Sequence, residues 1–244
     1  MLTRDWSSDV CSSDLPGLAL AALAVTGLPH AFNLIDGVNG LAGTVALVVC
    51  LALAHVAIQV GDRELAAIAS VMAASSAGFL FWNYPRGLIF AGDSGAYLWG
   101  LVIAVLSVLL VQRHAQVSPW FPVLVLMYPV WETLFSIYRK LARGDSPGMA
   151  DALHLHQLIY RRLAHSVLQA DEVDAVLRRN SRTAPYLWSF LVLTVAPALL
   201  FWQNSLVLMS FCLIFAVSYV IAYLSLIHFK AQRMFGGRGT GERS

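Results

Sequence analysis

Charged residues are scarce in this sequence. Of its 244 residues only 12% are Asp, Glu, Lys or Arg, whereas 58% are hydrophobic, and the mean hydropathy is +0.68. Because a soluble globular domain carries roughly 25% charged residues, we expect most of this surface to face lipid. The net charge of +2 is too small to indicate binding to nucleic acid.

Paired cysteines are also lacking. Three cysteines occur without any paired spacing, and Cys50 and Cys212 lie within apolar runs, where a thiol acts as a small hydrophobic group. The sequence therefore predicts neither a disulfide framework nor a metal–thiolate site.

The N-terminus lacks the features of a signal peptide. Residues 4–15 (RDWSSDVCSSDL) have neither an apolar core nor a basic flank. The stretch repeats SSD and resembles a translated sequencing adapter, with an ordinary disordered terminus as the alternative. We interpret residues 1–15 as a leader foreign to the rest, in which case an upstream part of the protein is missing.

Long apolar runs are abundant. A bilayer core requires about 20 apolar residues per helix. The candidate spans are 16–29, 41–60, 64–81, 94–112, 118–138, 184–202 and 205–228. They predict an all-α, polytopic membrane bundle of about seven transmembrane helices within a domain over 16–229.

The connections between the spans predict the orientation of the chain. Because each span crosses once, the connections 30–40, 82–93 and 139–183 share one side with the basic tail 230–244. Thirteen of the 16 Lys and Arg lie on that side, whereas Arg63 and Arg113 lie on the other. The positive-inside rule therefore places these connections in the cytoplasm.

The first of these connections reads NLIDGVNGLAG. Its polar residues Asn33, Asp36 and Asn39 are spaced by three, which places them on one face of a helical turn, and the glycines leave the backbone open to a ligand. Such clusters are also typical of turns and helix caps. The position of Asp36 at the edge of a span favours a functional role.

The second connection reads FWNYPRGLIFAGDSGAY. Asp93 opens the next span, where it or Ser94 could cap the helix, or Asp93 could hold Mg²⁺ together with phosphate oxygens. Phe90 suits either a base-stacking role or an anchor at the membrane interface. Arg86 is suited to meet phosphate.

The third connection contains DALHLHQLIYRR. His154 and His156 would diverge on a helix, so this pattern indicates an extended or turning segment aimed at one ligand, or else a solvated polar loop. A zinc site is disfavoured because no third ligand stands at zinc spacing. Contact with phosphate fits better beside Arg161 and Arg162, which otherwise suit anionic lipid headgroups.

One further carboxylate, Glu132, lies in the apolar run YPVWETLF. An unpaired carboxylate in lipid is costly. We therefore interpret Glu132 as structural, facing the bundle and meeting a partner such as Arg139. The other histidines are isolated.

Taken together, the three motifs resemble those of the polyprenyl-phosphate N-acetylhexosamine 1-phosphate transferases (glycosyltransferase family four), which include phospho-N-acetylmuramoyl-pentapeptide transferase and the transferases that begin O-antigen synthesis. The resemblance covers about residues 16–228. It implies a Mg²⁺-dependent reaction, with Mn²⁺ as an alternative, at the cytoplasmic face of a bacterial inner membrane. Undecaprenyl phosphate would attack the β-phosphate of a UDP-N-acetylhexosamine, giving a lipid-linked sugar diphosphate and UMP.

The resemblance also implies roles for individual residues. The catalytic set would be Asp36, Asp93, His154 and His156, with Asp93 as the metal ligand and the histidines at the phosphates. The UDP-sugar would contact Asn33, Asn39, Asn83 and Phe90, with Phe90 stacked on uracil. The resemblance does not name the sugar, and it leaves a homodimer open.

The sequence departs from the family pattern in three places. Asn39 stands where many members have a second Asp, and HLHQ replaces adjacent histidines; both variants look more like the O-antigen type. The paired aspartates of an earlier family loop have no counterpart here, so we expect the chain to be inactive alone. A transporter or a scaffold is the alternative, but transporters place polar sites near the bilayer midplane and often contain repeats, whereas the polar residues here lie at span ends.

Overall fold

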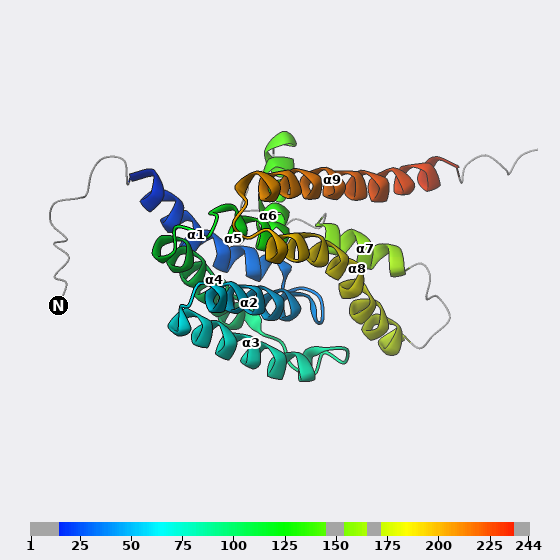
Figure 1. The fold of residues 1–244 in the computed structure, drawn as a ribbon. Helices are drawn as coiled ribbons and strands as arrows, with labels where there is room; N and C mark the ends of the chain where they lie inside the picture. The colour runs from blue at the N-terminus through cyan, green and yellow to red at the C-terminus, as the bar shows by residue number, and fades with distance from the viewer. Residues whose placement is uncertain (1–14, 145–153, 165–171, 237–244) are drawn as a thin grey trace, which may run out of the picture.

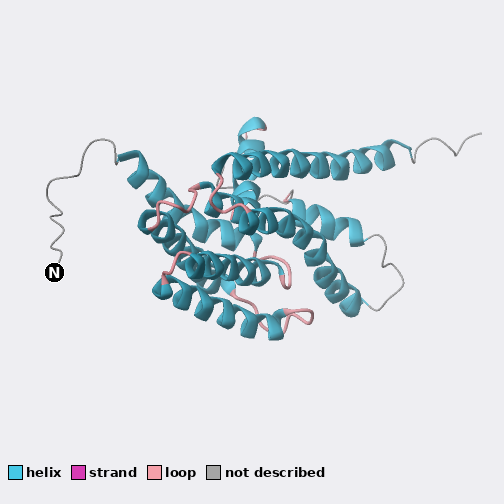
Figure 2. Cartoon of the chain, viewed as in Figure 1, coloured by secondary structure: helices cyan, strands magenta, loops and turns pink. Residues whose placement is uncertain are grey.

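The computed structural model describes residues 15–144, 154–164 and 172–236, in which every regular element is a helix and no strand occurs. Figures 1 and 2 show the helices, which are α1 (Leu15–Ile35), α2 (Leu41–Gln59), α3 (Arg63–Asn83), α4 (Gly92–Arg113), α5 (Trp120–Val125), α6 (Met127–Ala142), α7 (Leu155–Ala164), α8 (Glu172–Leu200) and α9 (Ser205–Gly236). Residues 1–14 of the predicted leader lie outside the described residues.

Six segments are long and apolar enough to cross a bilayer. They are Gly17–Ile35, Leu41–Gln59, Arg63–Asn83, Gly92–Arg113, Asn180–Leu200 and Ser205–Ile227. Large apolar side chains on them are exposed, for example Leu206 (74%) and Leu213 (66%) on α9, as expected of surfaces that meet lipid. The prediction of an all-α, polytopic membrane bundle is confirmed.

The span predicted over 118–138 is not one helix, so the predicted seven uninterrupted spans are corrected to six. Helix α5 ends at Val125 and α6 begins at Met127, with Leu126 between them at φ −94° and ψ 6°. Pro129 gives a physical reason for the break, because proline has no N–H for the Val125 carbonyl and its ring crowds that carbonyl.

The helices pack as two close pairs, α1 with α4 and α2 with α3. At the first contact, a Cβ added to Gly100 on α4 would lie 2.5 Å from the Pro29 backbone on α1. Only glycine permits this approach. The α1–α4 pair matters for function because each of these helices carries one of the predicted catalytic aspartates at the same end.

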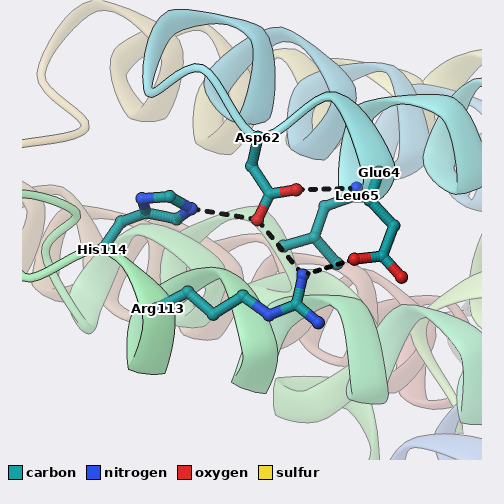
Figure 3. Close-up of polar contacts among 5 residues, drawn as sticks. All are labelled: Asp62, Glu64, Leu65, Arg113 and His114. Atoms are coloured by element: carbon teal, nitrogen blue, oxygen red, sulfur yellow. Dashed lines mark hydrogen bonds and ion pairs between the residues drawn. The ribbon is translucent and has the colours of Figure 1, made fainter. Parts of the chain in front are cut away.

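The turn between α2 and α3 meets the end of α4 through a polar cluster (Figure 3). Asp62 caps α3 by accepting a 3.0 Å hydrogen bond from the Leu65 N–H. Its other oxygen lies 3.0 Å from His114 Nε2, and Arg113 bridges Asp62 and Glu64 at 3.3 and 2.9 Å. The Leu65 N–H, helped by His114 and Arg113, holds the pKa of Asp62 below its usual value. This cluster lies at the end of the bundle opposite the predicted motifs.

Helix α5 also begins at an end distant from those motifs. The Ser118 N–H donates to the Trp202 carbonyl at 3.0 Å, and the hydroxyls of Ser118 and Ser205 lie 2.7 Å apart. Further along this segment, Glu132 on α6 meets the start of α7. The broken α5–α6 segment thus leads from the turn between α8 and α9 to the predicted motifs.

Candidate active site

The three predicted connections meet at one end of the bundle. Asn83, at the end of α3, accepts a 2.7 Å hydrogen bond from the Gly40 N–H and donates a 2.8 Å bond to the Ile89 carbonyl. Ser181 on α8 donates to the carbonyl of Pro85. These bonds join residues of all three connections, so the predicted grouping of the motifs on one face is confirmed.

Asp36 and Asp93 form an acidic pair between α1 and α4. Asp36 accepts a hydrogen bond from the Gly92 N–H at the start of α4. Asp93 is exposed in the first turn, and the cap position is Ala91. The alternative of Asp93 as the helix cap is therefore wrong. Burial raises the pKa of Asp36 to about 6, and the charge of Asp93 contributes to the rise although the Gly92 N–H opposes it.

Asn33 lies on the same side of α1 and reaches α4. Its side-chain N–H donates to the Tyr97 hydroxyl at 3.3 Å, and Tyr97 also packs edge-on against His30 with ring centroids 5.5 Å apart. Tyr97 stands one helical turn after Asp93. Sequence reasoning missed it, although the spacing of four from Asp93 was a usable signal.

Asn39 is buried, with 2% of its surface exposed. Its backbone N–H donates to the Asn180 side chain at 2.7 Å, and its side chain lies against Gly87 so closely that a Cβ there would be 2.5 Å away. Its Oδ1 has no hydrogen-bond partner among the described residues. Such a buried acceptor is costly unless something pairs with it, so this atom is suited to receive a donor from a ligand.

His154 and His156 stand side by side at the start of α7. His154 precedes the helix and its carbonyl accepts the Leu158 N–H at 2.9 Å. The two rings are parallel within 7°, with centroids 5.4 Å apart, and both side chains are buried. The two side chains come together as predicted, but the prediction of an extended or turning segment holds only for His154, because His156 lies within α7. Asp151, from the same motif, lies outside the described residues.

The histidine pair faces the acidic pair. A Cβ built on Gly37 would lie 3.7 Å from His156 Nε2, and Gly37 directly follows Asp36. Gly37 and His156 are therefore neighbours although 119 positions separate them in the sequence. Because Gly37 has no side chain, the space between it and the imidazole stays open. Phe90 (70% exposed) and Arg86 lie on the neighbouring connection with exposed side chains.

Glu132 lies behind the histidines and is 1% exposed. Its carboxylate accepts hydrogen bonds from the Leu155 N–H at 2.8 Å and the Tyr219 hydroxyl at 2.5 Å. The expectation that Glu132 is paired inside the bundle is confirmed. These partners differ from Arg139, the partner that the sequence analysis suggested.

The family model described as "Glycosyl transferase family 4" matches residues 9–111. This region contains the first two motifs, and curated relatives extend the match through the third. In this region the chain is similar to glycosyl transferase family 4. The family resemblance seen in the motifs is confirmed.

Several curated family 4 proteins are similar to the chain. A "Probable undecaprenyl-phosphate N-acetylglucosaminyl 1-phosphate transferase" of Bacillus subtilis (strain 168) is 32% identical over 138 residues, 56% of this chain and 38% of the relative. A "Decaprenyl-phosphate N-acetylglucosaminephosphotransferase" of Mycolicibacterium smegmatis is 28% identical over 239 residues, 90% of this chain and 55% of the relative. The chain thus spans about half the length of these relatives or less. No solved structure matches it.

The acidic pair of Asp36 and Asp93 fits a divalent cation. Mg²⁺ is usually held by one or two carboxylates plus substrate phosphates, and a cation offsets the repulsion between two neighbouring carboxylates. Among the described residues no group of three or more His, Cys, Asp or Glu could hold a metal. The two aspartates therefore fit a site that substrate oxygens complete.

Proposed function

We propose that the protein transfers an N-acetylhexosamine 1-phosphate from a UDP-sugar to undecaprenyl phosphate, releasing UMP. The observation that carries the proposal is the approach of His156 to Gly37, the residue that follows Asp36 of the acidic pair. Phosphoryl transfer depends mostly on positioning and charge neutralisation, and this arrangement places anionic and imidazole groups around one space. The transferase activities given in the names of the relatives support the same reaction.

In the proposed reaction a phosphate oxygen of the lipid forms a bond to the β-phosphorus of the UDP-sugar. The bond from that phosphorus to the bridging oxygen breaks, and UMP leaves with the electron pair. Asp93 and Asp36 would hold Mg²⁺, or Mn²⁺, which neutralises phosphate charge when bound. His154 and His156 would contact the phosphates, and the unpaired Oδ1 of Asn39 would accept a donor from the UDP-sugar.

The surroundings of the site complete the proposal. Asn33 is held by Tyr97 beside the acidic pair, and the exposed ring of Phe90 would stack on uracil. The side-chain amide of Asn83 forms hydrogen bonds with the backbones of Gly40 and Ile89. Asn83 would therefore shape the nucleotide site mainly by holding these two backbone segments in place. We place the site on the cytoplasmic face of a bacterial inner membrane, at the first membrane step of O-antigen or another cell-envelope polysaccharide.

The test is Mg²⁺-dependent UMP release from several UDP-N-acetylhexosamines with undecaprenyl phosphate. The chain is assayed alone and joined to the N-terminal spans of the Mycolicibacterium smegmatis relative. Asp93→Asn is expected to lower the rate about 100-fold or more without changing thermal stability, because Asp93 is exposed and is not the helix cap. Ser94→Ala is the matched control. No UMP release by the joined protein, or a normal rate for Asp93→Asn, would refute the proposal.

A further inference from the structure

Glu132 connects three helices at one buried point. It stands on α6, accepts the Leu155 N–H at the start of α7 and accepts the Tyr219 hydroxyl from α9. A carboxylate with 1% exposure is costly unless hydrogen bonds satisfy it. This arrangement supplies those bonds, and it does so directly behind the two histidines of the site.

Tyr219 is itself held in place by aromatic packing. Its ring meets Phe135 on α6 edge-on with centroids 5.4 Å apart, Phe190 on α8 at 6.2 Å and Phe215 on its own helix at 6.1 Å. Because these contacts fix the tyrosine ring, its hydroxyl gives the Glu132 carboxylate a fixed orientation. The oxygen that faces the histidines is therefore directed as well as buried.

That oxygen, Glu132 Oε1, lies between both imidazoles. It is 3.4 Å from Nδ1 of His154 and 3.6 Å from Nδ1 of His156. Both Nδ1 atoms are buried, and neither has a hydrogen-bond partner among the described residues. If Nδ1 lacked a proton, its lone pair would face a carboxylate oxygen, and two acceptors would repel each other inside the protein. A proton on each Nδ1 turns both contacts into attractive ones.

We infer that Glu132, oriented by Tyr219, is a positioning residue that holds the ring protons of His154 and His156 on Nδ1. The proton on one imidazole nitrogen is set by the partner of the other nitrogen. Nε2 of each ring then becomes the atom that gains or loses a proton. For His156 that atom is the one facing Gly37, beside Asp36.

The consequence for catalysis rests on the proposed function. With Nε2 free, His156 can accept a proton from a substrate phosphate or, once protonated, donate to it. Carboxylates that orient a working histidine are commonly worth about 10- to 100-fold in activity. We expect a loss in that range, mainly in kcat, when Glu132 loses its charge.

The experiment reads the ring nitrogens directly. The 244-residue chain, labelled with ¹⁵N-histidine and held in detergent micelles, is studied by long-range ¹H–¹⁵N NMR at a pH where the rings are neutral, with His154→Gln and His156→Gln to assign the signals. Both rings are expected in the Nδ1–H form. Glu132→Gln keeps an acceptor for the Leu155 N–H and is expected to shift both rings toward the Nε2–H form. Glu64→Gln, an exposed carboxylate in the opposite polar cluster, is the matched control.

Two results would overturn the inference. One is an Nε2–H form of either ring in the unsubstituted protein. This measurement does not depend on whether a variant folds. The other is an unchanged Nδ1–H form in folded Glu132→Gln. Tyr219→Phe keeps the carboxylate charge but removes the hydroxyl that orients it, so its rings are expected to stay mainly Nδ1–H, with a smaller shift toward the Nε2–H form than in Glu132→Gln. Nδ1–H rings in the chain, together with no UMP release by the joined protein, would support the inference and count against the proposed function alone.

Discussion

The backbone N–H of Asn39 donates a 2.7 Å hydrogen bond to the side-chain oxygen of Asn180, although 141 positions separate them in the chain. This bond joins the first connection to α8. It also holds the backbone beside the Asn39 Oδ1, the buried acceptor that lacks a partner among the described residues. The shape of the proposed nucleotide site therefore depends on a residue outside the three motifs.

Replacing Asn180 by Ala should destabilise the protein. The substitution leaves the buried N–H of Asn39 without an acceptor, which costs about 1–3 kcal/mol. Thermal unfolding in detergent measures the effect. Asn180→Asp keeps an acceptor oxygen and should stay close to the unsubstituted protein, as should Ser189→Ala at an exposed position of α8. Equal stability of Asn180→Ala and Asn180→Asp would show that this bond is unimportant.

Asp36 should make stability depend on pH in the absence of metal. Its pKa of about 6 in the folded protein exceeds the ordinary value of about 3.9 for an unfolded chain. Between these values the folded state holds a proton that the unfolded state has released, so the contribution of Asp36 to stability falls as pH rises through this window.

The measurement compares thermal unfolding of the unsubstituted protein and Asp36→Asn in EDTA from pH 4 to 7.5. The unsubstituted protein should lose stability relative to Asp36→Asn as pH rises to about 6 and then stay level. Added Mg²⁺ at pH 7.5 should recover the difference, because a cation offsets the two carboxylate charges. A difference that does not vary with pH would contradict the proposed environment of Asp36.

Gly100→Ala should disturb the packing that brings the two aspartates together. The new Cβ would lie 2.5 Å from the backbone of Pro29, and overpacking of this kind costs about 1–3 kcal/mol. Gly78→Ala is the matched control, because nothing lies within 4 Å of its added Cβ and Ala is the better helix former. The temperature of thermal unfolding should fall for Gly100→Ala only. An equal change in this temperature for both variants would argue against the close contact.

Phe90→Ala should weaken nucleotide binding without loss of stability. Phe90 is 70% exposed, so little packing is lost, whereas stacking of a base on an aromatic ring contributes about 1–3 kcal/mol. Calorimetric titration with UDP-N-acetylglucosamine measures the change. Phe81→Ala, which removes a 78% exposed ring on α3, should bind normally. If Phe90→Ala bound UDP-N-acetylglucosamine with unchanged affinity, Phe90 would instead be an anchor at the membrane interface.

Cysteine labelling should place the site on one side of the membrane. Single cysteines at the exposed positions Arg86 and Arg161 should react with an impermeant reagent from the same side, and a cysteine at Glu64 from the opposite side. The native Cys50 and Cys212 are buried and give a low background once Cys11 is replaced. Labelling of positions 86 and 161 from different sides would refute the topology.

Much of the architecture was predictable from local sequence. Apolar runs of about 20 residues predicted the six crossing segments, because the bilayer thickness fixes the length of a spanning helix. Asp36, Asp93 and the histidine pair were identifiable because polar side chains are rare in this chain and stand at the ends of apolar runs. The convergence of His154 and His156 was also predicted, although His156 lies on a helix, which the spacing had argued against.

The tertiary structure alone decided which groups serve one another. Asp36, rather than Asp93, receives the first N–H of α4, and Glu132 meets the start of α7 and Tyr219, 23 and 87 positions away. Pro129 was a local signal for the break at Leu126. That Glu132, a few residues later, lies behind the histidines could be seen only in the tertiary structure. A sequence pattern indicates that a residue requires partners, as a buried carboxylate requires hydrogen-bond donors. Which donors satisfy it depends on how the helices pack, because segments distant in the chain supply them.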